Sequence, residues 1–188
     1  MTGFQFKNIS PLTLSAVEIV GERVRLVPIT NKYETDIFHE FTAAVTRYMF
    51  PKPPETIHDT RTFIRRSQET MKSGNNLQLV ILQRETSEFL GCCGLHGKDN
   101  GRKPELGLWL KAGAHGHRYG REAITILVDW AKIHLEVDGF IYPVDRQNIA
   151  SRKIPESLGG QIAREAQVVA QSGQVLDEVV YEIPTFGR

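Results

Sequence analysis

The amino-acid sequence predicts an α/β fold (α+β, with one mixed sheet) in which helices flank the sheet. Three observations support this prediction. Segments of alternating apolar residues are interleaved with segments whose apolar residues recur at helical spacing. The 188 residues are 40% hydrophobic and 24% charged, which suits a soluble domain with a sizeable core. Residues 103–130 contain a strand, a glycine-bearing loop and a helix in direct succession. We therefore expect strands and helices to alternate along part of the chain.

The strands are predicted from alternating patterns and from turn residues between short apolar runs. Residues 1–20 are expected to form an N-terminal lead with a strand at 12–20, and residues 21–188 a single domain. Gly21 and Glu22 turn the chain into its clearest alternating segment, 23–28. Further strands are predicted at 77–83, 89–95, 103–110, 140–144, 162–170 and 175–183, with a polar turn at 96–102 and a Ser-Gly turn at 172–173.

Four helices are predicted from apolar residues at helical spacing. They span 36–48, 56 or 58 to about 71, 119–134, and 145–158, where two glycines follow. Prolines at 51, 53 and 54 separate the first two, because proline lacks an amide hydrogen and restricts its predecessor. The inward-facing residues of these two are expected to be Ile37, Phe38, Phe41, Val45, Phe63 and Ile64. The order βααβββαβαββ is an antiparallel meander that runs into a right-handed βαβ unit.

Composition excludes several classes of function. The formal net charge of +1 argues against a broad nucleic-acid-binding surface. No long uncharged apolar run predicts a membrane span, and the N-terminus lacks an export signal. Cys92 and Cys93 are adjacent, so in a strand they point to opposite faces and are not expected to pair or to share a metal. Reduced core thiols in a cytoplasmic protein are the expectation.

The loop before the third helix is a candidate anion site. The first turn of a helix presents free N–H groups and the positive end of the helix dipole. Gly116 and Gly120 would let the backbone approach a ligand closely, and Arg118 and Arg121 add positive charge. An ordinary βα connection with a solvated basic turn is the alternative interpretation.

Two local patterns in this framework resemble a known family. Residues 115–120 (HGHRYG) look like the pyrophosphate loop of the GNAT superfamily of acyl-CoA-dependent N-acyltransferases, and residues 148–153 (NIASRK) look like the Asn-x-x-Ser run of its next helix. Together with residues 21–26 (GERVRL), they are most similar to the ribosomal-protein N-acetyltransferase (RimJ/RimL-like) branch. The resemblance spans roughly 22–183 and implies a strongly twisted, splayed sheet.

The resemblance implies acetyl-CoA as co-substrate and no metal. Backbone N–H groups of residues 116–121 would hold the pyrophosphate, and the pantetheine arm would lie between two splayed strands. Gly107 is a candidate site for a β-bulge that opens the gap. The pair His115 and His117 is interpreted as a loop feature, because no third metal ligand is in view. The implied cofactor-binding residues are Leu108, Leu110, His115, Gly116, His117, Arg118, Tyr119, Gly120, Arg121, Asn148 and Ser151.

The resemblance also implies an acid and a base. An ammonium must lose a proton before its nitrogen attacks a thioester, and Glu105 occupies the position of the general base of some family members. Ser151 matches the position of the acid that protonates the thiolate, and Asn148 would orient the cofactor. Glu105 could instead be a surface residue, and Ser151 or Asn148 a helix cap. Transfer is expected to be direct, with an oxyanion stabilised near Leu108 and no covalent enzyme intermediate.

Two departures from the family pattern motivate an alternative. Arg118 stands where the loop usually has glycine, and Pro155 stands where some members have a proton-donating tyrosine. Pro155 should also kink the predicted helix, since it removes one backbone hydrogen bond. The alternative is a sensor module that binds acyl-CoA with little or no turnover.

The acceptor is the least specified part. The resemblance places a primary amine, either a protein N-terminus or a small molecule, between residues 48–54 and roughly 171–174. Trp109 could line that pocket or be a core residue, and His96 is interpreted as structural. A homodimer is one possibility that the sequence leaves open. Neither nucleic acid nor membrane is expected as a partner.

Overall fold

The computed structural model describes residues 3–7, 13–97 and 101–185. Over these ranges the chain forms a mixed sheet in the order β1-β2-β3-β4-β5-β6-β8-β7. The strands are β1 (Ile19–Val20), β2 (Val24–Pro28), β3 (Asn76–Gln83), β4 (Phe89–His96), β5 (Glu105–Leu110), β6 (Gly139–Asp145), β7 (Gln161–Val169) and β8 (Val175–Pro184). The helices are α1 (Glu34–Glu40), α2 (Ile57–Lys72), α3 (Tyr119–His134) and α4 (Ile149–Ser157). The predicted fold class and the order βααβββαβαββ are confirmed, and β1 precedes them within the range 12–20 where a strand is expected.

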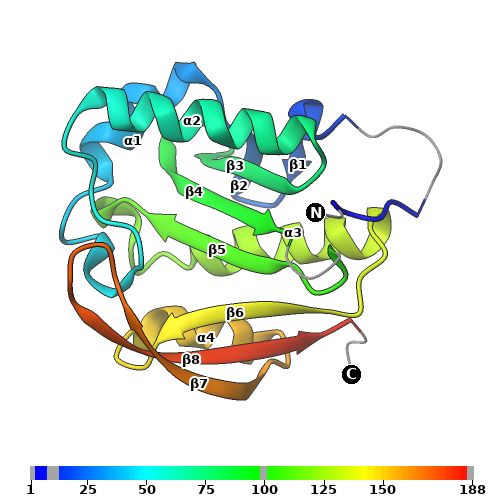
Figure 1. The fold of residues 1–188 in the computed structure, drawn as a ribbon. Helices are drawn as coiled ribbons and strands as arrows, with labels where there is room; N and C mark the ends of the chain where they lie inside the picture. The colour runs from blue at the N-terminus through cyan, green and yellow to red at the C-terminus, as the bar shows by residue number, and fades with distance from the viewer. Residues whose placement is uncertain (1–2, 8–12, 98–100, 186–188) are drawn as a thin grey trace.

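The sheet lies between two helical layers (Figure 1). α1 and α2 cover one face, and α3 and α4 cover the other. Neighbouring strands are antiparallel except β5 and β6, which are parallel and joined through α3. Strands β3 and β4 are buried along nearly their whole length, which accounts for their almost continuous apolar sequences.

α2 and α3 form where the sequence predicts them. α3 begins at Tyr119 and ends at His134, and its buried face runs through Ala123, Leu127 and Ala131. α2 begins after Thr56, whose side chain forms a reciprocal capping box with Asp59. Periodicity located both helices because each buries one apolar stripe.

The predicted helix 36–48 is too long. α1 ends at Glu40, and a separate 3-10 turn forms at Thr46–Tyr48. At Phe41 the backbone leaves the helical region (φ −83°, ψ 67°), and its ring packs 4.8 Å from the ring of Trp109. The helix therefore ends at a residue with a tertiary ring contact, where the sequence carries no glycine or proline.

One predicted inward residue of α2 is wrong. Ile64 is fully buried, but Phe63 is 39% exposed. The buried stripe instead includes Thr60 and Ser67, at helical spacing from Ile64. Neighbouring helix positions point about 100° apart, so only one member of the Phe63–Ile64 pair can face the sheet.

Two other predicted boundaries shift. In the range 12–20, residue 12 lies outside the described residues, a 3-10 turn occupies Leu14–Ala16, and only Ile19–Val20 is a strand. Residues 98–100 of the predicted polar turn also lie outside the described residues. The helix expected from 145 begins at Ile149, because Asp145 is still part of β6. The carboxylate of Asp145 accepts N–H groups of Gln147 (2.8 Å) and Asp177 (3.1 Å) and so ends the strand in a turn.

Candidate functional site

The loop between β5 and α3 presents an open helix N-terminus. Gly116 has φ +81° and Arg118, the N-cap residue, has φ +64°. No side chain caps the first turn of α3 in the described structure. The N–H groups at this end therefore remain available to an anion, in line with the predicted role of residues 116–121.

Arg118 adopts a left-handed conformation that a side chain disfavours. This conformation costs a non-glycine residue roughly 1–2 kcal/mol. The glycine of the family pattern would adopt it without strain. Compared with glycine, Arg118 has the same backbone N–H and adds a positive charge to the loop, but its backbone is strained.

The two histidines of the loop make different contacts. Nε2 of His115 lies 2.9 Å from the carbonyl oxygen of Leu110, so the loop folds back on the end of β5. His117 is exposed, and its ring centroid lies 5.7 Å from that of Tyr119. No group of three or more potential metal-ligating side chains occurs among the described residues.

Gly116 and Gly120 serve different purposes. A side chain at Gly116 would meet open space, so its positive φ is what favours glycine there. A Cβ at Gly120 would lie 2.8 Å from Cδ2 of Leu108 and 3.4 Å from Cδ1 of Leu110. The close approach that Gly120 permits is thus between α3 and β5. Packing against β5 thus accounts for glycine at this position, and the close approach to a ligand stays a prediction.

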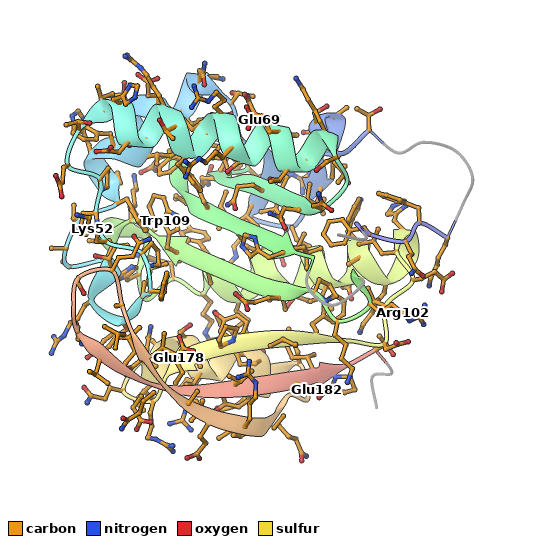
Figure 2. The ribbon with its side chains drawn as sticks, in the orientation of Figure 1. Lys52, Glu69, Arg102, Trp109, Glu178 and Glu182 are labelled. Carbon is orange, nitrogen blue, oxygen red and sulfur yellow. The ribbon has the colours of Figure 1, made fainter. Side chains whose placement is uncertain are left out.

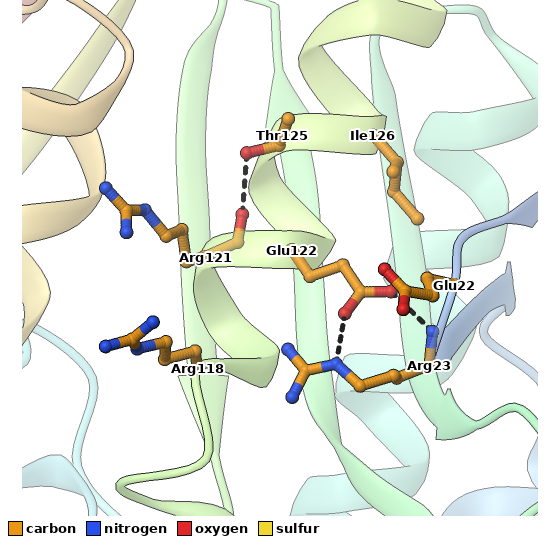
Figure 3. A pocket seen from close by; sticks show the side chains of 7 residues that line it. All are labelled: Glu22, Arg23, Arg118, Arg121, Glu122, Thr125 and Ile126. Atoms are coloured by element: carbon orange, nitrogen blue, oxygen red, sulfur yellow. Dashed lines mark hydrogen bonds and ion pairs between the residues drawn. The ribbon is translucent and has the colours of Figure 1, made fainter.

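An ion pair that sequence analysis missed ties β2 to this loop (Figure 3). Oε1 of Glu122 accepts the N–H groups of Arg23 (2.7 Å) and Val24 (3.2 Å), and Oε2 accepts Nε of Arg23 (2.9 Å). The same guanidinium donates to the carbonyl of His117 (3.0 Å) and lies 5.2 Å from the ring centroid of Tyr119. Arg23 and Glu122 are 99 residues apart, so no local pattern signals the contact.

A hollow of about 390 Å³ lies beside this clamp. Figure 3 shows Arg118 and Arg121 extending to the same side, away from the Arg23–Glu122 pair. The two guanidinium groups thus flank the open end of α3. The lining residues are Glu22, Arg23, Arg118, Arg121, Glu122, Thr125 and Ile126.

Strands β5 and β6 separate beyond a single ladder position. Their pairing is limited to Glu105 opposite Ile141, whereas β5 pairs with β4 from Glu105 to Leu110. Among the described residues, the other edge of β5 therefore has no strand partner beyond Glu105, and this edge carries the backbone of Leu108 and Leu110. The bulge predicted at Gly107 is wrong, because its register with β4 is continuous. The gap arises from divergence of β6.

At the start of α4, Asn148 and Ser151 take distinct positions. Asn148 is the N-cap residue, and its Oδ1 accepts the N–H of Ser151 at 3.3 Å. The capping alternative therefore holds for Asn148, whereas Ser151 lies within the first turn. The hydroxyl of Ser151 is 2.9 Å from the hydroxyl of Tyr142 on β6. Burial raises the pKa of Tyr142 to about 12, so this phenol stays protonated at neutral pH.

Pro155 lies in the last turn of α4 and is buried. It cannot donate to the carbonyl of Ser151, four residues earlier. The carbonyl of Pro155 accepts the N–H groups of Leu158 (3.0 Å) and Gly160 (2.9 Å) as the helix ends. A proline at this position provides no acidic proton.

The two thiols are core residues. Cys92 and Cys93 are free and buried in β4. Burial raises the pKa of both thiols well above the ordinary range, which disfavours the thiolate that a nucleophile would need. Their environment agrees with the expectation of direct transfer.

The predicted acceptor segments meet at one end of the sheet. The N–H of Gln171, in the β7–β8 turn, donates to the carbonyl of Phe50 (2.9 Å), and Oε1 of Gln171 accepts the N–H of Lys52 (3.3 Å). Figure 2 shows Lys52 and Trp109 at this end, with Arg102 and Glu182 at the other. Trp109 is half-buried and contacts the rings of Phe41 and Phe89 (5.7 Å). It therefore belongs to the core and also faces the region of the acceptor segments.

The described residues include no helix that is long and apolar enough to cross a membrane.

Comparisons with known proteins match this chain to acetyltransferases. Residues 23–161 match the model of a family described as acetyltransferase (GNAT) domain. The uncharacterized N-acetyltransferase p20 of Bacillus licheniformis is 29% identical over 119 residues, which is 62% of this chain and 66% of that protein.

Solved structures show the same fold at low identity. The acetyl transferase from Salmonella typhimurium that modifies the N-terminal serine of the 50S ribosomal subunit protein L7/L12 gives a TM-score of 0.78 at 13% identity, over 89% of this chain and 99% of that one. The microcin C7 self immunity acetyltransferase MccE, in complex with acetyl-CoA and AMP, gives 0.76 at 17% identity, over 87% and 93%. At these identities the likeness concerns the fold alone.

Proposed function

The chain belongs to the GNAT family of N-acetyltransferases, and from this premise we propose that it transfers the acetyl group of acetyl-CoA directly to a primary amine. One observation carries the proposal. The uncapped N-terminus of α3, flanked by Arg118 and Arg121, adjoins an edge of β5 that, in the part of the chain that the structure describes, has no strand partner beyond Glu105. An anion site beside an unpaired strand edge suits a ligand with a pyrophosphate at one end and an amide-bearing arm at the other.

The residues divide the binding of acetyl-CoA between them. Backbone N–H groups at the start of α3 would bind the pyrophosphate, and the two arginines would add Coulomb attraction. The unpaired backbone near Leu108 and Leu110 would bind the pantetheine arm as an added strand, and an N–H there would stabilise the oxyanion. Tight packing of Gly120 on Leu108 keeps these two sites at a constant distance.

Proton transfer is assigned to the two predicted groups. Glu105 lies where β5 and β6 begin to diverge, and its carboxylate would take part in removing the proton of an incoming ammonium. Ser151 would protonate the departing thiolate. Its hydroxyl needs a defined orientation for this role, and the hydrogen bond to the protonated Tyr142 supplies one.

The acceptor is proposed to enter near the contact between Phe50 and Gln171. The Salmonella protein modifies the N-terminal serine of a ribosomal protein, which makes a protein N-terminal α-amine one candidate, and a small-molecule amine is the other.

The sensor alternative has its own supporting observation. Arg118 is strained where the family pattern has glycine, and Pro155 provides no proton. Binding would survive both changes, whereas turnover would depend on Glu105 and Ser151.

Calorimetric titration with acetyl-CoA, followed by thiol release against amines and N-terminal peptides, tests the proposal. Saturable binding and amine-dependent thiol release that is lost in Glu105→Gln support the transferase. Binding without release from any amine supports the sensor. Failure to bind acetyl-CoA would contradict both.

A further inference from the structure

A histidine on β4 reaches over the strand that carries Glu105. His96 lies directly opposite Glu105 in the β4–β5 ladder. Directly opposite residues of an antiparallel pair project to the same face, with Cβ atoms roughly 4.5–5.5 Å apart. The sequence suggests only a structural role for His96, because the strand register that brings it opposite Glu105 is not visible there.

The imidazole occupies space that a missing side chain leaves free. A Cβ built on Gly107 would lie 3.0 Å from Nε2 and 3.5 Å from Cδ2 of His96. The ring therefore leans diagonally across β5 and covers the backbone of Gly107. Any side chain at this position would crowd the ring, so Gly107 and His96 fit each other in shape.

This ring lies on the face of β5 that also carries Trp109, next to the position where β5 and β6 diverge. Leu108 and Leu110 contact Gly120 and so face α3. Alternation along the strand places Glu105, Gly107 and Trp109 on the opposite face, where Trp109 contacts Phe41. β6 leaves β5 after Glu105, so in the described structure the unpaired edge of β5 begins at the residue opposite His96, on the side of β5 away from β4.

We propose that His96 is a catalytic residue that takes the proton from the acceptor ammonium, in place of direct transfer to Glu105, and that Glu105 stabilises the resulting imidazolium. The inference rests on the proposed transferase function and deepens it. Efficient general bases ordinarily titrate near the working pH, and an imidazole does so where a carboxylate does not. The pairing resembles other sites in which a carboxylate supports a histidine base.

The proposed step balances. The ammonium nitrogen gives one proton to the imidazole, which releases it to water, and its freed electron pair forms a bond to the thioester carbonyl carbon. The carbon–sulfur bond then breaks, and its electron pair leaves with sulfur. The second proton of the former ammonium is transferred to the thiolate, so the products are an amide, a thiol and one released proton.

The test is chemical rescue of His96→Ala. We expect amine-dependent thiol release to fall about 100-fold, within the range of general-base catalysis, with acetyl-CoA affinity unchanged. Added imidazole should restore part of the rate, and substituted imidazoles of higher pKa should restore more. His134→Ala is the matched control, because His134 stacks on Trp130 in α3 at 5.0 Å, and this variant should keep the wild-type rate.

Two further variants separate catalysis from packing. His96→Gln keeps a polar side chain of similar reach without a basic nitrogen, so it should be as slow as His96→Ala. The double variant Glu105→Gln/His96→Ala should be little slower than the slower single variant, because the two groups act as one unit. A His96→Gln enzyme at the wild-type rate, or a rescue that does not depend on imidazole pKa, would overturn the proposal.

The outcomes also distinguish this inference from the proposed function. If Glu105→Gln is slow while both His96 variants are normal, the transferase stands and His96 is not catalytic. If the wild-type chain binds acetyl-CoA but releases no thiol with any amine, the proposed function fails, and the role of His96 fails with it.

Discussion

The two ends of the proposed reaction path are built in different ways. The cofactor side is one continuous stretch, from β5 through the loop to α3, and its key conformations are the positive φ angles of Gly116 and Arg118. The acceptor side is assembled from segments far apart in sequence, such as Lys52 and Gln171, which are 119 residues apart. Acetyl-CoA, which is the same in every reaction, can be bound by a local, rigid unit. The acceptor amine differs between enzymes and can be bound by loops that change independently of one another.

The largest expected effect is on the cofactor side. In Gly116→Asp, a carboxylate would face the anion site from a residue whose φ of +81° disfavours side chains. We expect the Kd for acetyl-CoA to rise at least about 100-fold, measured by calorimetry. Gly113→Asp is the matched control, because Gly113 lies in the same exposed loop, meets nothing within 4 Å and has no positive φ. An equal loss in Gly113→Asp would show that loop charge alone explains the effect.

The difference between the two sides also decides how much the sequence could predict. The loop and α3 were located residue by residue, because strand, loop and helix each follow from neighbouring residues. The end of α1 was missed, because it falls at Phe41, where no glycine or proline marks it and the ring packs on Trp109, 68 residues away in sequence. The Arg23–Glu122 clamp, and the imidazole of His96 over Gly107, depend on strand register that no local pattern encodes.

The next effect tests whether the cofactor loop depends on β2. Glu122→Ala would leave the N–H groups of Arg23 and Val24 without their acceptor. Losing partly buried hydrogen bonds of this kind should lower the free energy of unfolding by about 1–3 kcal/mol, measured by urea denaturation. Glu69→Ala on α2 is the control, since its 4.0 Å ion pair with Arg65 is exposed and should change stability by less than about 0.5 kcal/mol. Equal losses in both variants would remove the special role of the clamp.

A smaller effect is expected on the acceptor side. Gln171→Ala removes the 3.3 Å hydrogen bond from the N–H of Lys52 but keeps the backbone bond to Phe50. The loop should become less ordered, and KM for the amine should rise about threefold to fivefold, the equivalent of one exposed hydrogen bond. The Kd for acetyl-CoA should not change. Gln174→Ala, on the same β-turn, is the control and should leave KM for the amine unchanged. A change in the Kd for acetyl-CoA in either variant would contradict the separation of the cofactor side from the acceptor side.

The smallest effect concerns the strained residue of the cofactor loop. Arg118→Gly would relieve a left-handed conformation that costs roughly 1–2 kcal/mol, but glycine also loses about 0.5–1 kcal/mol more backbone entropy on folding. The free energy of unfolding should therefore rise by less than about 1 kcal/mol. Arg118→Ala removes the same charge and keeps the strain, so its stability should match the wild type.

Both variants should bind acetyl-CoA more weakly at low salt, and the deficit should shrink as salt is added, because a mobile exposed charge is screened. Denaturation and calorimetry on the same three proteins separate the two contributions. Stability that rises in Arg118→Gly alone, with affinity that falls in both, would show that Arg118 is retained for its charge despite its strain. Equal stability of Arg118→Gly and Arg118→Ala would mean that the left-handed conformation of residue 118 does not lower the free energy of unfolding.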